Sequence, residues 1–126
     1  MILRAGIDMS SVSALARRAE RSRNDFIGRY WSAAEIEQSG GSFSSLAARW
    51  SAKEAAMKAL GAGIGKIDPA HIEVVLVDGM PTLRLHKSAK RRSAELGLEH
   101  WTVSLTHQGD WALASIVAMG GMGDDK

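Results

Sequence analysis

The pattern of apolar and polar residues changes along the chain between the period of a strand and that of a helix. Residues 2–8, ILRAGID, alternate enough to form a short strand that ends at Asp8. Apolar residues at helical spacing then predict a helix over residues 11–23. The sequence SAAE at 32–35 fits a capping box that opens a second, short helix, which Gly40 and Gly41 end.

The second half of the chain predicts a long helix, a hairpin, a further helix and two strands. Ser44 or Ser45 is suited to cap the long helix, which runs to Leu60 before a glycine-rich loop. The remaining elements are a hairpin that turns at Asp78-Gly79, a helix over residues 88–96, and strands at HWTVSLTH and WALASIVAM. We therefore expect an α+β fold with an antiparallel sheet packed against helices, in one domain over residues 1–118 with a disordered tail over 119–126.

The long helix carries charged residues where apolar ones are expected. At about 100° per residue, one face forms an apolar stripe of Phe43, Leu46, Trp50, Met57 and Leu60. Lys53 falls inside this stripe, Glu54 lies at its edge, and Lys58 follows one turn later. In one interpretation Lys53 extends its ammonium to solvent and Glu54 pairs with Lys58; in the other, Glu54 binds a metal and the lysines meet an anion. On the opposite side, alanines at 48, 52, 55 and 59 would permit close approach of another backbone.

Composition and charge narrow the classes of function. The 126 residues, 45% apolar and 24% charged, are typical of one soluble globular domain, and the longest apolar run is too short to span a membrane. The sequence has no cysteine, which excludes disulfides and thiolate metal sites. The N-terminus shows no export signal, so we expect a cytoplasmic protein. The net charge is only +2, but basic residues gather at 17–23 and 87–92.

Several familiar motifs are incomplete or missing. GAGIGK at 61–66 resembles a phosphate-binding loop, but its spacing is one residue short, Ile67 replaces the required Ser or Thr, and the loop follows a helix. A glycine-rich helix end explains this segment, although its backbone amides would still suit a phosphate. His107 follows a polar strand face, which fits either a surface residue or a donor to phosphate. We find no Ser-His-Asp set and no close pair of histidines, so a hydrolase triad and a zinc site lack support.

Taken together, these segments resemble the holo-acyl-carrier-protein synthases, the small bacterial type of 4′-phosphopantetheinyl transferase. The matching segments are GID at 6–8, FIGRYWSAAE at 26–35, LAARWSAKEAAMKALGAGIGK at 46–66, IEV at 72–74, GMPTLRL at 79–85 and SLTH at 104–107. The combination of W-x-x-K-E-x-x-x-K with G-x-D and S-x-T-H is highly specific. Gln108 departs from the family's frequent Glu after the histidine, and residues 9–16 lack its acidic-Ile-Arg pattern.

The resemblance implies a reaction and a set of site residues. The 4′-phosphopantetheine arm of coenzyme A would be transferred to a serine of an acyl carrier protein, with release of 3′,5′-ADP. Asp8 and Glu54 would hold Mg²⁺, with Mn²⁺ as an alternative, and Lys58 would complete the catalytic set. The residues implied to bind coenzyme A are Arg49, Lys53, Lys58, Gly61, Gly63, Thr106 and His107. Glu54 and a metal-bound water are both candidates for the base that takes the serine proton.

The resemblance also implies partners. The family forms homotrimers with active sites between subunits, so we expect Asp8 and Glu54 to meet His107 of a neighbouring subunit. An acidic carrier of fatty-acid biosynthesis, of polyketide synthesis or within a larger synthase would dock on Arg17, Arg18, Arg21 and Phe26. The alternatives are a basic nucleic-acid-binding module and a homologue that binds coenzyme A without transfer. The lack of an RNA-binding motif and the retained carboxylates favour the enzyme, and we expect neither a membrane nor a nucleic acid as partner.

Overall fold

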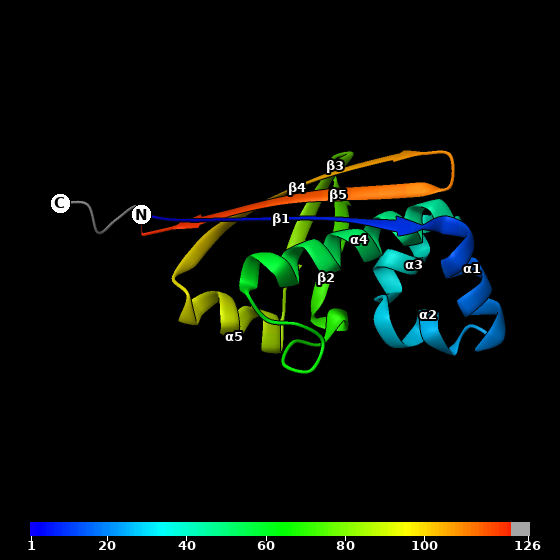
Figure 1. Cartoon of the computed structure of the whole chain (residues 1–126), viewed down its shortest axis with the longest axis horizontal. Coiled ribbons are helices and arrows are strands. Elements are labelled where there is room, and N and C mark those ends of the chain that lie inside the picture. Colours follow the sequence, from blue (N-terminus) through cyan, green and yellow to red (C-terminus); the bar gives the residue numbers. More distant parts are fainter. Residues whose placement is uncertain (122–126) are drawn as a thin grey trace.

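The computed structural model describes residues 1–121, which fold into two antiparallel sheets and a set of helices around one long helix (Figure 1). In chain order the elements are β1 (Ile2–Ser11), α1 (Val12–Arg21), α2 (Asp25–Tyr30), α3 (Ala33–Ser39), α4 (Phe43–Leu60), the 3₁₀ turn η1 (Pro69–His71), β2 (Ile72–Val77), β3 (Met80–Leu85), α5 (Lys87–Glu95), β4 (Leu98–Gln108) and β5 (Trp111–Gly120). The predicted α+β class is confirmed. None of the described helices is long and apolar enough to cross a membrane.

The strands form two separate sheets, where the sequence predicts one. The larger sheet has the order β1–β5–β4, and the smaller one is the β2–β3 hairpin. β1 runs to Ser11, past the predicted end at Asp8, because it stays paired with β5 as far as Trp111. β5 continues to Gly120, two residues into the segment predicted as a disordered tail. Residues 122–126 of that tail lie outside the described residues.

Local sequence sets the ends of the central helices. Ser32 and Glu35 form the predicted capping box, each side chain accepting a hydrogen bond from the other residue's backbone N–H. Helix α4 is capped by Ser42, whose hydroxyl accepts from the N–H of Ser45, so the predicted caps at Ser44 or Ser45 are wrong. The helix ends at Gly61, whose φ of +66° is the left-handed conformation common at helix ends.

Helix α4 lies along the inner face of the larger sheet and touches β1 through small residues (Figure 1). The predicted alanine strip does admit another backbone, since Ala52, Ala55 and Ala59 are all buried in the core. Gly6 of β1 lies so close that a Cβ atom built there would be 1.8 Å from the carbonyl oxygen of Ala55. Only glycine fits this position, and its small size sets the distance between strand and helix.

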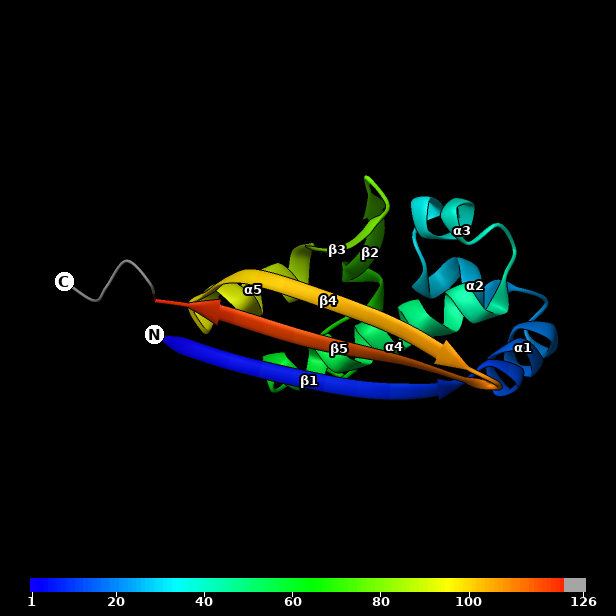
Figure 2. The ribbon, with the colours of Figure 1, turned by 90° about the horizontal axis from the view of Figure 1, so that it is seen from above.

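The outer face of the larger sheet, seen from above in Figure 2, is open to solvent, and β1 and β5 place mainly apolar side chains on it. Because side chains alternate along a strand, one face of β1 presents Leu3, Ile7 and Met9, which are 61%, 62% and 50% exposed. Trp111 and Val117 of β5 extend the same face. Contiguous apolar surface of this kind is typical of a protein interface.

Candidate active site

Two carboxylates and a lysine converge where β1 meets α4. Asp8 follows Gly6 by two residues and therefore points to the same, inner side of β1. Lys58 Nζ donates to Asp8 Oδ1 at 3.0 Å and to the carbonyl oxygen of Ile7 at 2.8 Å. Lys58 thus pairs with Asp8 and not with Glu54, the partner one helical turn away that the first interpretation gave it. The side chain of Lys58 remains 56% exposed, so its ammonium is within reach of a ligand.

Glu54 lies next to this pair in a partly buried position. Burial raises the pKa of the Glu54 carboxyl, the charge of Asp8 raises it further, and Lys58 opposes the change. With two carboxylates beside one lysine, the site carries more negative than positive charge, and such an arrangement favours an added cation. In the described part of the chain no three His, Cys, Asp or Glu residues gather at one point. A metal at this position would therefore have Asp8 and Glu54 as its protein ligands.

The glycine loop borders the same site. A surface hollow there is lined by Glu54, Met57, Lys58, Gly61, Ala62 and Gly63. Gly61 forms the end of α4, as expected from a glycine-rich helix end, so the segment is not a strand-to-helix phosphate loop. Its three glycines, at 61, 63 and 65, are all exposed and still leave backbone accessible beside the lysine and the carboxylates.

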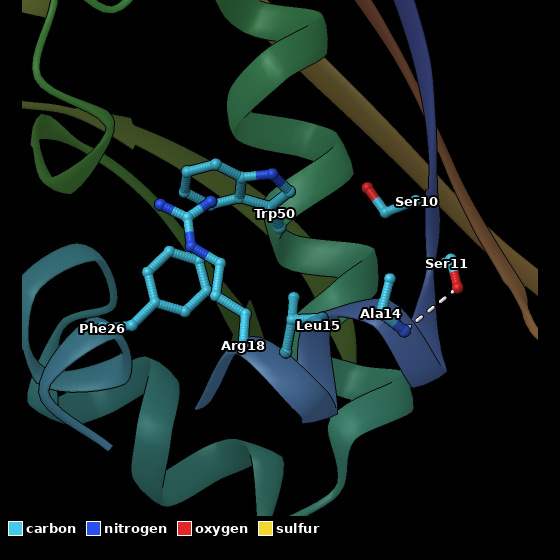
Figure 3. A pocket seen from close by; sticks show the side chains of 7 residues that line it. All are labelled: Ser10, Ser11, Ala14, Leu15, Arg18, Phe26 and Trp50. Atoms are coloured by element: carbon cyan, nitrogen blue, oxygen red, sulfur yellow. Dashed lines mark hydrogen bonds between the residues drawn. The ribbon is translucent and has the colours of Figure 1, made fainter. Parts of the chain in front are cut away.

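A second pocket lies against the basic helix α1 (Figure 3). It is lined by Ser10, Ser11, Ala14, Leu15, Arg18, Phe26 and Trp50. The guanidinium carbon of Arg18 lies 4.0 Å from the centre of the Phe26 ring, in cation–π geometry. Figure 3 shows Phe26, Arg18 and Trp50 on one side of the pocket and the two serines of β1 on the other. Arg17, Arg18 and Arg21 are all exposed on α1, and Phe26 is nearly buried beneath Arg18.

Lys53 and Arg49 are buried and do not face this site, which corrects the expectation that they contact coenzyme A. Lys53 is 0% exposed, and its ammonium donates to Glu35 Oε1 at 2.9 Å and to the carbonyl oxygens of Pro69 and Ile72. All three of its hydrogens are used, so no phosphate can reach it. Burial lowers the pKa of Lys53, and the charge of Glu35 opposes that shift.

Arg49 belongs to the same buried polar row. Its Nε donates to the carbonyl oxygen of Val74 at 3.1 Å, and one Nη donates to Gln38 Oε1. The amide of Val74 donates to Glu35, and Gln38 both donates to and accepts from the backbone of Leu76. One edge of β2 has no neighbouring strand in the two-stranded sheet. These side chains form hydrogen bonds with the backbone N–H and C=O groups of that edge, as a third strand would.

Glu35 and Gln38 therefore have a structural role that sequence reasoning missed: they bind the unpaired edge of β2, and Glu35 also binds Lys53. The available signal was their spacing of three residues, which places both on one face of α3. The sequence pattern assigns Glu35 only to the capping box. That role is correct but incomplete, since Glu35 is 0% exposed and also balances the charge of Lys53.

Thr106 and His107 lie apart from the carboxylates within one subunit. Both are exposed on β4, and as successive strand residues they point to opposite faces of the sheet. The strand β5 separates β4 from β1, which places the backbones of His107 and Asp8 about 10 Å or more apart. Within one chain, His107 therefore lies outside the contacts that join Asp8 and Lys58.

The fold also assembles a serine, a histidine and an aspartate that sequence reasoning did not detect. Ser88 Oγ lies 2.7 Å from His71 Nδ1, but His71 Nε2 is 3.8 Å from Asp68 Oδ2, beyond hydrogen-bond distance. The carboxylate of Asp68 is instead bonded to Arg29 by two hydrogen bonds. The histidine is thus not oriented by the acid as it is in a hydrolase triad.

Comparison with known proteins identifies the family. The model of the 4′-phosphopantetheinyl transferase superfamily matches residues 4–116. The chain belongs to this superfamily. The match includes the segments that carry Asp8, Glu54, Lys58 and His107.

Relatives and solved structures agree with this assignment. The holo-[acyl-carrier-protein] synthase of Herpetosiphon aurantiacus is 44% identical over 127 residues, covering 94% of this chain and 100% of the relative. The Helicobacter pylori holo-[acyl-carrier-protein] synthase in complex with coenzyme A superposes with a TM-score of 0.83 at 26% identity, covering 91% of this chain and 99% of that one. The synthase from Neisseria meningitidis also gives a TM-score of 0.83, at 28% identity and 92% and 97% coverage.

Proposed function

We propose that this protein is a holo-acyl-carrier-protein synthase, which transfers the 4′-phosphopantetheine arm of coenzyme A to a serine of an apo acyl carrier protein in a Mg²⁺-dependent reaction. The observation that carries the proposal is the meeting of Asp8, Glu54 and Lys58 beside an accessible glycine loop. Membership of the superfamily and likeness to a synthase bound to coenzyme A support it.

The residues present fit a magnesium ion that shares its coordination with a substrate. Mg²⁺ prefers oxygen ligands and usually binds through one or two carboxylates together with phosphates and waters. Asp8 and Glu54 supply two carboxylates beside the single ammonium of Lys58, and a cation would balance the excess negative charge. When bound, Mg²⁺ would act as a Lewis acid on the pyrophosphate of coenzyme A. Lys58 Nζ would donate to a phosphate oxygen and stabilise the charge that develops there.

The pocket beside α1 is the surface that best fits the carrier. It opens between the basic helix and the two carboxylates: Ser10 lies two residues after Asp8 on β1, and Trp50 lies one turn before Glu54 on α4. Its apolar walls with Arg18 at the rim suit an apolar side chain of an acidic partner. A carrier docked on Arg17, Arg18 and Arg21 would bring its serine toward the carboxylates.

The open face of the larger sheet supports assembly into a homotrimer. Apolar side chains of β1 and β5 lie on this face, and an interface between subunits would remove them from water. His107 lies two strands away from Asp8 within the chain, so a neighbouring subunit is the natural source of a histidine for the site. We infer that each active site contains Asp8, Glu54 and Lys58 from one subunit and His107 from the next.

The direct test is incubation with coenzyme A, Mg²⁺ and purified apo-carriers, followed by mass spectrometry of the carrier. We expect a gain equal to one phosphopantetheine group, loss of the reaction with EDTA and its return with added Mg²⁺. Glu54→Gln should abolish transfer without unfolding the protein, whereas Glu37→Gln, a matched change on the exposed side of α3, should have no effect. Ordinary transfer by Glu54→Gln would refute the assignment of the site. Fatty-acid and polyketide carriers tested side by side would identify the substrate class.

A further inference from the structure

The glycine-rich loop between α4 and η1 is fixed mainly at its two ends. At its start, Arg92 Nε donates to the carbonyl oxygen of Leu60 at 3.0 Å. Inside the loop, the amides of Lys66 and Ile67 both donate to the carbonyl oxygen of Gly63. The exposed residues 63–66 therefore depend on how the far end of the loop is held, where Ile67 is buried in the core and Asp68 follows it.

Asp68 joins three elements at that far end. Its carboxylate accepts hydrogen bonds from Nη1 and Nη2 of Arg29 on α2, at 3.1 and 3.0 Å, and from the amide of Ala70 at 2.9 Å. Its own amide donates to Ser88 Oγ on α5 at 3.1 Å. The hydrogen bonds from Arg29 keep the pKa of Asp68 below its usual value, so the pair is charged at neutral pH.

We propose that Arg29 and Asp68 form a latch that fixes the end of the glycine loop and thereby raises the affinity of the protein for coenzyme A. The inference rests on the proposed function, since it assumes that the loop receives the nucleotide. Both are positioning residues, because neither lines the hollow formed by Glu54, Lys58 and Gly61. A loop held in its bound conformation loses less conformational entropy when a ligand binds, and the affinity rises accordingly.

The contacts of Arg29 indicate a role different from that of the basic cluster on α1. It is exposed, lies close in sequence to Arg17, Arg18 and Arg21, and shares α2 with Phe26, so position alone would assign it to carrier docking. Its guanidinium instead forms a fork-to-fork pair with Asp68, and it lines one surface hollow together with loop residues 64–67. If Arg29 belongs to the latch, its loss should weaken the binding of coenzyme A and leave the binding of the carrier unchanged.

The test measures coenzyme A binding by calorimetry with Mg²⁺ and no carrier. Arg29→Ala and Asp68→Asn should each raise the dissociation constant about two- to fivefold, the range expected for loss of one well-formed exposed ion pair. The double variant Arg29→Asp with Asp68→Arg should recover most of the affinity for coenzyme A, because it restores the ion pair with the two charges exchanged. In steady-state transfer, the KM for the carrier should stay unchanged in Arg29→Ala, whereas Arg17→Ala should show the opposite pattern.

The outcomes separate this inference from the proposed function. Failure of the wild-type protein to bind coenzyme A would refute the proposed function itself. Binding by the wild type and equally tight binding by a folded Arg29→Ala protein would overturn the latch alone. A larger KM for the carrier in Arg29→Ala, with unchanged coenzyme A binding, would instead place Arg29 in the docking surface. Because Arg29 is on the surface, its truncation leaves the core intact and the measurement remains interpretable if Asp68→Asn does not fold.

Discussion

Replacement of Gly6 by alanine should separate strand β1 from helix α4 and disable the active site without unfolding the protein. The added Cβ would lie 1.8 Å from the carbonyl oxygen of Ala55, whereas real Cβ atoms stay beyond 3.0 Å from such atoms. The strand must therefore move by about 1.2 Å, and Asp8, two residues further on, moves with it away from Glu54. Displacements of about 1 Å in an active site can lower rates about 100-fold, and we expect a loss of this size in carrier modification.

The size of the packing strain decides whether the variant still folds. Overpacking a core by one methyl group costs about 1–3 kcal/mol, against a total stability of about 5–15 kcal/mol for a small domain. Gly6→Ala should thus keep its circular dichroism spectrum and melt at a lower temperature.

Gly28→Ala is the matched control for this experiment. A Cβ at Gly28 meets no atom within 4 Å, and the residue lies inside helix α2. The change should stabilise the protein by about 0.5–1 kcal/mol and leave the transfer rate unchanged. A folded Gly6→Ala protein with the wild-type rate would refute the argument that this glycine places Asp8.

Three further predictions address the docking surface, the assembly and the scaffold. Reversal of Arg17 and Arg21 to Glu should raise the KM for an acidic carrier about tenfold at low salt and leave the KM for coenzyme A unchanged, since charge complementarity mainly accelerates association; equal loss for both substrates would contradict it. Inactive Asp8→Asn and His107→Ala proteins should regain activity when mixed and reassembled, whereas a fully active monomer by light scattering would exclude a shared site. Lys53→Met should lower the free energy of unfolding in urea by about 3–5 kcal/mol, because it leaves the buried carboxylate of Glu35 without its counter-ion; an unchanged midpoint would contradict it.

Features set by neighbouring residues can be predicted from the sequence. The capping box of α3 and the glycine that ends α4 depend on contacts within a few residues, and both predictions are confirmed. The alternating pattern of β4 likewise places Trp101, Val103 and Leu105 on its inner side. The spacing of the motifs also indicates the family, which the superfamily match over residues 4–116 confirms.

Features that depend on distant partners cannot be predicted in this way. β1 extends beyond the residues that alternate in sequence because β5 continues beside it. The role of Gly6 depends on the carbonyl of Ala55, which lies 49 residues further along the chain. The pairing of Lys58 with Asp8 joins residues far apart in sequence, whereas helical spacing alone suggests Glu54. In each case the local pattern identifies the residue type but not the element that folds against it.

Lys53 illustrates this limit and explains the charged position within the apolar stripe of α4. Its place among apolar positions indicates burial, and a buried ammonium requires both a counter-ion and acceptors for its remaining hydrogens. The helix cannot reveal that the counter-ion is Glu35, because that residue already has a local use as the cap of α3. A carboxylate has enough lone pairs for both tasks: Oε1 accepts from Ser32 and Lys53, and Oε2 accepts from Val74. The first lysine of the K-E-x-x-x-K motif is thereby committed to the scaffold, which leaves Lys58 as the lysine of the motif that a phosphate can reach.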